Sequence, residues 1–197
     1  GIIASNPMYQ AGVLDPDCCD KATVFACLCD AFNVPLIFLT DVPGFIVGRQ
    51  AEHDRLLSKA IMFLEALANV EVPRLTVVLR KAFGLAFYSM SGSNMGGDLI
   101  VAWPSAEISF MDPAVGVNVV YADKLRALPN GDEERARLIA EWSGGAEPYG
   151  AAGIMALDEI IDPAETRPFL IRALEKLAVP PPPRGYLKPL QSWPTCL

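Results

Sequence analysis

The chain has 197 residues, of which 52% are hydrophobic and 20% charged, so it can build one domain with a large apolar core and is not a disordered protein. Its 16 basic and 23 acidic residues leave a net charge of −7, which argues against a protein that binds duplex nucleic acid through a basic face. No apolar run reaches the roughly 18–20 residues that cross a bilayer, so we expect no membrane partner.

The start of the chain and its cysteines predict the compartment. Residues 1–5 lack the basic start of a secretory signal, and the missing initial Met indicates a chain that was processed, tagged or cut from something longer. Five cysteines are too few for a disulfide framework, and a single histidine, His53, leaves no metal-ligand pattern. We therefore expect reduced thiols, no metal, and a protein of the cytoplasm, or of the mitochondrial matrix in a eukaryote. The cysteines are Cys18, Cys19, Cys27, Cys29 and Cys196.

Hydrophobic periodicity predicts alternating helices and buried strands. Residues 1–16 are typical of a loop, and Asp17 is the expected N-cap of the first helix. The expected helices cover about residues 17–32, 50–69, 85–95, 114–125, 132–143 and 166–177, with a short helical turn at 148–156. The expected strands cover about residues 35–41, 74–80, 99–103, 107–111 and 159–162. This order predicts an α/β fold with helices covering a mostly parallel sheet, followed by an extended tail from Pro180–Pro183.

Several familiar catalytic motifs are absent from the sequence. There is no GxGxxG dinucleotide loop, no P-loop and no GxSxG nucleophile elbow. His53 lies among Glu52, Asp54 and Arg55, which is typical of a solvated helix face rather than of a general base. A hydrolase that relies on a serine or cysteine with a histidine therefore has little support.

The first notable loop, Asp41-Val42-Pro43-Gly44-Phe45, directly follows a buried strand. The carboxyl ends of parallel strands form the ligand crevice in α/β proteins. The loop is therefore either part of a binding site, with Pro43 and Phe45 as apolar contacts, or a tight turn whose phenylalanine folds back on the core. If it is a site, Asp41 could orient residues 42–45 by accepting backbone hydrogen bonds.

The second loop leads from a strand into a helix at Gly84, Leu85 and Ala86. The first N–H groups of a helix have no partner inside it and carry partial positive charge. The N–H groups of Leu85 and Ala86 could therefore form an oxyanion hole that needs no particular side chain. The alternative is an ordinary turn between a strand and a helix.

These loops belong to a set of motifs that resembles the carboxyltransferase subunit of biotin-dependent acyl-CoA carboxylases. The resemblance extends over residues 1–177, nearly the whole chain. The motifs occur in the family's order and make the resemblance specific. They are residues 29–35 (CDAFNVP), 41–45 (DVPGF), 78–84 (VLRKAFG), 102–108 (AWPSAEI), 117–121 (VNVVY) and 162–167 (DPAETR).

The resemblance implies a crotonase-type fold of stacked ββα units, with residues 1–179 as the second, carboxybiotin-side domain of that subunit and residues 180–197 as a Pro-rich tail. In the family, carboxybiotin supplies CO2 to the α carbon of an acyl-CoA, and no side-chain base is needed. The backbone N–H groups of Leu85 and Ala86 would be the catalytic donors that hold the ureido oxygen of biotin. The implied residues that bind biotin or substrate are Val42, Pro43, Gly44, Phe45, Gly84 and Tyr88.

Some positions depart from the family's usual pattern. Leu85 stands where glycine is common and could narrow the approach of biotin. Ala114 and Val115 replace the usual glutamate and glycine, Val47 replaces a proline, and the tail has a different ending. Tyr88 matches a position near the acyl pocket and either limits acyl chain length or is a partly buried surface tyrosine.

The resemblance also implies partners: an acyl-CoA, with propionyl-CoA or acetyl-CoA favoured, and a biotin carboxyl carrier or biotin carboxylase subunit. The apolar helix at 50–69 predicts a homo-oligomer, from dimer to hexamer, through that helix and the segment around Phe87. Two alternatives stay open. The chain could be a non-catalytic assembly domain of crotonase fold, or a crotonase-like decarboxylase or hydratase.

Overall fold

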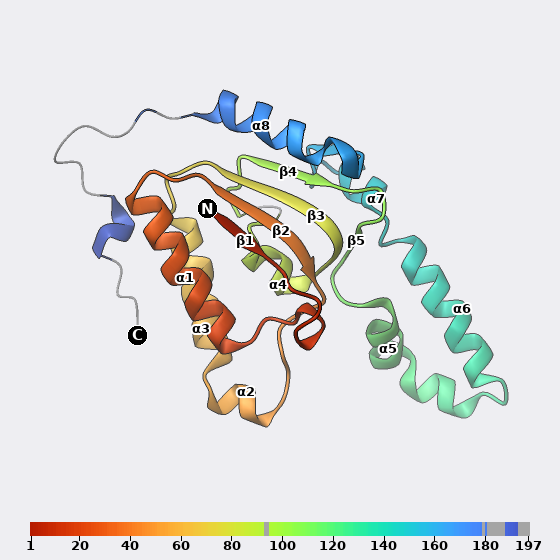
Figure 1. The fold of residues 1–197 in the computed structure, drawn as a ribbon. Helices are drawn as coiled ribbons and strands as arrows, with labels where there is room; N and C mark the ends of the chain where they lie inside the picture. Colours follow the sequence, from red (N-terminus) through yellow and green to blue (C-terminus); the bar gives the residue numbers. More distant parts are fainter. Residues whose placement is uncertain (93–94, 179, 181–187, 193–197) are drawn as a thin grey trace.

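The computed structural model describes residues 1–92, 95–178, 180 and 188–192, and its centre is a parallel β-sheet (Figure 1). The strand order is β1-β2-β3-β4-β6, and β5 pairs with the far end of β3. All of these strand pairs are parallel, as the alternation of helices and strands predicts. The strands are β1 (Ile2–Ala4), β2 (Leu36–Val42), β3 (Arg74–Phe83), β4 (Leu99–Ala102), β5 (Glu107–Ser109) and β6 (Glu159–Ile160).

Helices cover both faces of this sheet. Phe38 of β2 packs with Phe63 of α3 on one face, while Phe169 and Leu170 of α8 pack around Val77 on the other. A hairpin of α5 and α6 extends away from the sheet (Figure 1). No helix in the described part of the chain is both long and apolar enough to span a membrane. The helices are α1 (Pro16–Ala31), α2 (Arg49–His53), α3 (Leu56–Ala68), α4 (Gly84–Ser89), α5 (Pro113–Ala127), α6 (Gly131–Gly144), α7 (Pro148–Gly153) and α8 (Thr166–Leu177), with 3-10 turns η1 (Gln10–Gly12), η2 (Pro163–Glu165) and η3 (Pro189–Ser192).

The first helix begins two residues earlier than the sequence indicates. Asp15, not Asp17, is its N-cap, and the Asp15 carboxylate accepts a hydrogen bond from the Cys18 N–H at 2.7 Å. Pro16 occupies the first helical turn, where its missing N–H and fixed φ are favourable. Asp17 lies in the first turn instead, where its negative charge suits the helix dipole.

The single helix expected at 50–69 is two helices, α2 and α3. The break is at Arg55, whose backbone is left-handed with φ 60° and ψ 37°. After the break α3 lies along α1, where it buries Phe63 and Leu67 and pairs Lys59 with Asp20. Residues 49–55 are polar apart from Ala51, and the apolar positions of α3 begin at Leu56, directly after the break.

Two further boundaries differ from the expected ones. Residues 1–16 contain a strand, β1, which is three residues long and pairs Ile2 with Ile37 of β2; so short a strand has no detectable period. The helix expected at 85–95 ends at Ser89, because Ser91 turns into the left-handed region. The Ser91 carbonyl instead accepts a hydrogen bond from the Thr76 hydroxyl on β3 at 2.7 Å.

A short C-terminal segment is pinned against α1 and α3. The Lys188 ammonium donates to the Asp30 carbonyl at 2.7 Å and lies 3.4 Å from the Asp30 carboxylate, and both side chains are buried. The same carboxylate accepts the backbone N–H groups of Glu71 and Val72. Leu190 packs nearby against both helices. Of the Pro-rich tail that the sequence predicts, residues 181–187 and 193–197 lie outside the described residues, and the domain boundary at 179 stays a prediction.

We expect Asp30→Ala to lower the free energy of unfolding by about 3 kcal/mol, because it removes the buried countercharge of the Lys188 ammonium and the carboxylate that accepts the Glu71 and Val72 N–H groups. Urea unfolding at neutral pH measures this. The matched control is Asp20→Ala, which removes a partly exposed partner of Lys59 and should change stability by less than about 1 kcal/mol. Equal losses in the two variants would contradict the role of Asp30.

Candidate functional site

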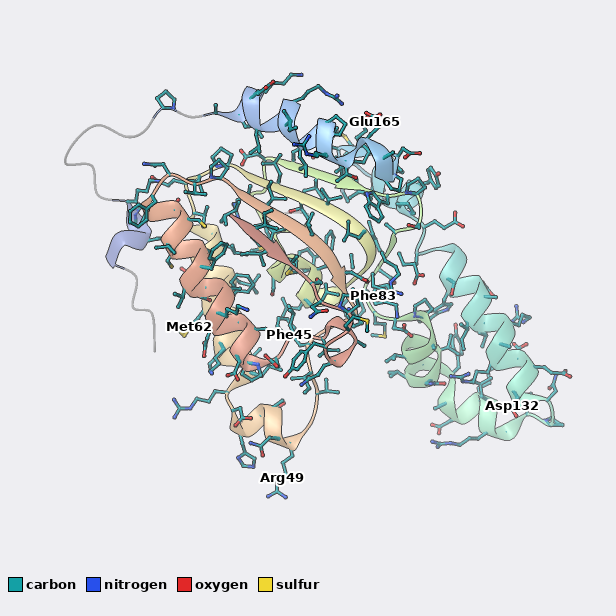
Figure 2. All side chains as sticks on the ribbon, in the orientation of Figure 1. Phe45, Arg49, Met62, Phe83, Asp132 and Glu165 are labelled. Atoms are coloured by element: carbon teal, nitrogen blue, oxygen red, sulfur yellow. The ribbon has the colours of Figure 1, made fainter. Side chains whose placement is uncertain are left out.

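The two loops singled out from the sequence leave neighbouring strands at one edge of the sheet. β2 ends at Val42 and β3 at Phe83, and the parallel register pairs Val42 with Ala82. Phe45 and Phe83 accordingly lie at the same end of the sheet (Figure 2). The structure thus brings together the residues that the sequence assigns to a site, because parallel strands deliver their carboxyl ends to one edge.

The loop after β2 is held by the backbone of Leu14. The Leu14 N–H donates to the Gly44 carbonyl at 3.0 Å, and the Ile46 N–H donates to the Leu14 carbonyl at 2.9 Å. Phe45 is half-buried and packs against the core beside α1 and α3, as the tight-turn alternative expects. Val42 is fully buried, while Pro43 and Gly44 remain partly accessible at the sheet edge.

The loop after β3 makes an abrupt turn at Gly84. Its φ is +55°, and a Cβ at this position would lie only 2.8 Å from the Phe110 carbonyl oxygen. Glycine is therefore required both by the backbone conformation and by the close approach of another segment. The turn starts α4, in which the Leu85 side chain is 42% exposed and the Ala86 side chain only 1% exposed.

The N–H groups in the first turn of α4 have the character of an anion site. They lack carbonyl partners within the helix. Within the described residues, no side chain and no loop carbonyl accepts a hydrogen bond from Leu85 or Ala86 N–H. These groups can therefore hold an oxygen that carries negative charge. Tyr88, the last predicted site residue, is 37% exposed on the same helix and its ring centroid lies 6.1 Å from that of the buried Phe87.

A charged pair lies between the two loops. The Arg80 guanidinium forms a salt bridge with Asp41 at 3.1 Å, and the Lys81 N–H donates to the same carboxylate at 3.2 Å. The neighbouring carboxylate raises the pKa of Arg80. Asp41 is thus hydrogen-bonded to β3, and not to the backbone of residues 42–45 as the sequence suggests. The sequence did not predict that Arg80 pairs with Asp41. The only indication was that a basic residue stands shortly before the glycine turn.

The histidine and the described cysteines do not lie at the edge where β2 and β3 end. His53 is exposed at the end of α2, and burial raises the pKa of Cys19 to about 12, so its thiol stays protonated at neutral pH. Four cysteines, Cys18, Cys19, Cys27 and Cys29, are free thiols, and Cys196 lies outside the described residues. In the described part of the chain, no three His, Cys, Asp or Glu residues gather closely enough to hold a metal ion.

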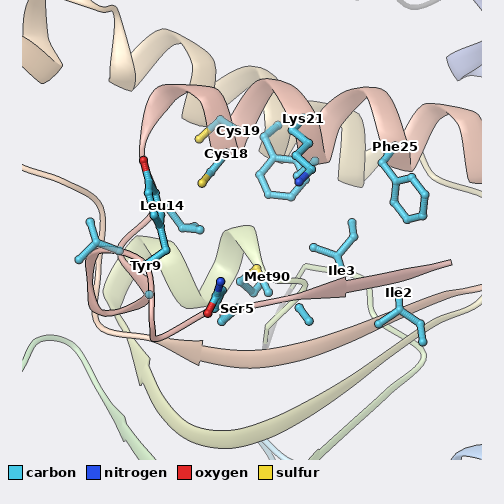
Figure 3. Close-up of a pocket in the computed structure, with 16 residues that line it drawn as sticks. Ile2, Ile3, Ser5, Tyr9, Leu14, Cys18, Cys19, Lys21, Phe25 and Met90 are labelled. Atoms are coloured by element: carbon cyan, nitrogen blue, oxygen red, sulfur yellow. The ribbon is translucent and has the colours of Figure 1, made fainter.

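A separate cavity lies between α1 and β1 (Figure 3). Its volume is about 690 Å³, and apolar side chains such as Ile3, Phe25, Phe63 and Met90 line it. None of the predicted site residues at 42–45 or 84–88 is among its lining residues. The candidate site is therefore the open edge where β2 and β3 end, rather than this cavity.

The comparison with known proteins identifies the family of this chain. The carboxyl transferase domain model matches residues 1–181. The chain belongs to the carboxyl transferase domain family. The crotonase-type fold expected from the resemblance is likewise confirmed, since the structure superimposes on the transcarboxylase 12S crystal structure, determined with methylmalonyl-CoA and methylmalonic acid bound, with a TM-score of 0.84 at 38% identity.

Two relatives indicate how much of a carboxyltransferase the chain represents. It is 40% identical over 179 residues to the methylmalonyl-CoA carboxyltransferase 12S subunit of Propionibacterium freudenreichii, covering 90% of this chain and 34% of that subunit. It is 39% identical over 178 residues to a putative propionyl-CoA carboxylase beta chain of Bacillus subtilis. That match covers 90% of this chain and 35% of the Bacillus protein. The structural superposition on the 12S subunit covers 96% of this chain and 37% of the 12S chain. The chain therefore spans about a third of the length of these carboxyltransferase relatives.

We expect Gly84→Ala to destabilise this carboxyl transferase domain by about 1–3 kcal/mol, because it combines a left-handed backbone with a contact that a Cβ cannot make. Gly144→Ala is the matched control, since a Cβ there would meet nothing within 4 Å. It should change stability by less than about 1 kcal/mol. Thermal unfolding compares the two, and an unchanged melting temperature for Gly84→Ala would refute the assigned turn geometry.

Proposed function

We propose that the chain is the biotin-side half of an acyl-CoA carboxylase carboxyltransferase. It would serve transfer of CO2 from carboxybiotin to the α carbon of an acyl-CoA, with propionyl-CoA or acetyl-CoA as the favoured substrate. The observation that carries this proposal is the family match over residues 1–181 together with the open Gly84 turn at the sheet edge. The relatives' names, which refer to methylmalonyl-CoA and propionyl-CoA, support the substrate class.

The turn has the donors that the proposed reaction needs. When bound, carboxybiotin supplies the CO2 group, and its ureido oxygen gains negative charge as that group leaves. The N–H groups of Leu85 and Ala86 would hold this oxygen, which suits donors that carry no charge and need no side-chain chemistry. Gly84 allows the turn, and the accessible parts of Pro43, Gly44 and Phe45 would form the adjoining wall, backed by the buried Val42.

Leu85 and Tyr88 would determine what fits beside these donors. Both side chains are partly exposed on α4, so they are available to a ligand at its N-terminal turn. The Leu85 side chain would narrow the approach of biotin relative to the glycine common in the family. Tyr88 would limit the length of the acyl group. Neither side chain is a base, in agreement with a reaction that needs no side-chain base to accept the α-proton of the substrate.

The proposed site is composite, because the chain spans only about a third of its relatives. The rest of the subunit would bind the acyl-CoA, and a biotin carboxyl carrier or biotin carboxylase subunit would deliver the carboxyl group. We also propose a homo-oligomer, supported by the hexamer named for the 12S structure and by the exposed Leu57 and Ile61 of α3. Phe87 itself is buried, and the segment around it exposes Leu85 and Tyr88, so its part in the oligomer stays a prediction. Free thiols support a reducing compartment such as the cytoplasm.

We expect Leu85→Pro in the whole subunit to lower carboxyl transfer by about 100-fold or more, because proline removes one oxyanion donor. Leu85 is a better probe than Ala86, whose buried side chain cannot be replaced without disturbing the core. Leu85→Ala keeps the N–H and is the control. Turnover and circular dichroism are measured together, and a folded proline variant with near wild-type turnover would leave Gly84–Ala86 as an ordinary turn.

We expect the 197-residue chain alone to carboxylate no acyl-CoA, because transfer requires both reactants to be held in register. The assay supplies a carboxylated carrier protein and radiolabelled propionyl-CoA, with the whole subunit as the positive control. Activity in the isolated chain would contradict the composite site. Inactivity of the whole subunit would instead favour the assembly-domain alternative.

A further inference from the structure

The ladder between β2 and β3 is interrupted next to the proposed site. Thr40 pairs with Val78, and the next pair is Val42 with Ala82, so Asp41 alone faces three residues of β3. Extra residues in one strand bend it and change its direction. Before the interruption β3 pairs with β4; after it, Lys81–Phe83 pair with β5. The curvature of β3 toward β5 is visible in Figure 1.

Asp41 holds this bend in place. One carboxylate oxygen accepts the Lys81 N–H at 3.2 Å and the Arg80 Nε at 3.2 Å, while the other lies 3.1 Å from an Arg80 terminal nitrogen. Both oxygens thus face the residues that the ladder leaves unpaired. Asp41 is buried and Arg80 about half exposed, so the carboxylate is fixed by its surroundings and the arginine closes over it. Hydrogen bonds of this charge-assisted kind are stronger than neutral ones.

We propose that Asp41 is a positioning residue for the Gly84–Ala86 turn and, if the proposed function is correct, for carboxyl transfer. The turn begins three residues after Lys81, and Gly84 lies against the Phe110 backbone directly after β5. The direction in which β3 leaves the bend therefore determines where the N–H groups of Leu85 and Ala86 point. Asp41 touches neither reactant; it acts through the backbone of Lys81 and the side chain of Arg80.

Amide hydrogen exchange on the full 197-residue chain tests this role without any activity. In Asp41→Ala we expect the hydrogen-bonded amides within residues 79–86, that of Lys81 first among them, to exchange about tenfold faster or more than in the wild type. Asp98→Ala is the matched control: Asp98 accepts the Arg74 N–H at 2.8 Å, at the other end of the same strand. It should speed exchange around Arg74 and leave residues 79–86 unchanged.

Kinetics of the whole subunit test the consequence for the reaction. Asp41→Ala should lower kcat by about 10- to 100-fold and leave KM for the acyl-CoA nearly unchanged, since it misplaces donors rather than removing a binding contact. Asp41→Asn keeps an oxygen for the Lys81 N–H but loses the charge, so its kcat should lie between those of Asp41→Ala and the wild type. Asp98→Ala should keep wild-type kcat.

Three results would overturn the proposal: unchanged exchange at residues 79–86 in Asp41→Ala, equal acceleration there in Asp98→Ala, or faster exchange with wild-type kcat. If Asp41→Ala does not fold, Asp41→Asn carries the same comparisons, with the same expected directions. A wild-type subunit that transfers no carboxyl group would refute the proposed function, and the exchange data would still decide whether Asp41 positions the turn.

Discussion

The parallel pairing of β2 with β3 is the constraint on which the arrangement of the candidate site depends. It brings the ends of both strands to one edge, so that Val42 and Ala82 are neighbours although about forty residues separate them in the chain. The ladder is interrupted at Asp41, close to the point where β4 ends at Ala102 and β5 takes its place as the neighbour of β3. Directly after β5, the backbone of Phe110 lies against Gly84. The site is therefore produced by a local irregularity within a regular sheet.

Two apolar layers, one on each face of the sheet, stabilise the strands despite the interrupted hydrogen-bond ladder. Leu36 and Phe38 of β2 pack beneath α1 and α3, and Val77 of β3 and Val101 of β4 pack beneath α8, so apolar layers cover both faces of the central sheet. Burial of this kind stabilises the strands by apolar contact, independently of any single hydrogen bond. Inside the same layers, one carboxylate oxygen of Asp30 accepts the N–H groups of the two residues Glu71 and Val72 that precede β3. The central sheet can thus tolerate a bend at its edge.

The chemistry proposed for this edge depends on backbone groups. An oxyanion held by N–H groups requires a turn of defined geometry but no acidic, basic or nucleophilic side chain. This explains how a chain with one exposed histidine, and with Cys19 buried and protonated, is compatible with an enzymatic role. It also explains why a search for catalytic side chains finds nothing in this sequence. Gly84 is informative because its conformation and the space around it leave room for no other residue.

The sequence alone determined the α/β class, the central strands and the two site loops, because apolar periodicity, prolines and glycines act over short distances along the chain. It also carried the family resemblance that the comparisons confirm. Only the tertiary structure decided that β1 is a strand, that Arg55 divides the single helix expected at 50–69, and that Asp41 is held by Arg80 and Lys81. Each of these depends on a partner distant in sequence: β2 for β1, α1 for α3, and the bent end of β3 for Asp41. Local patterns contain no information about such partners, since their energies arise only when the layers pack together.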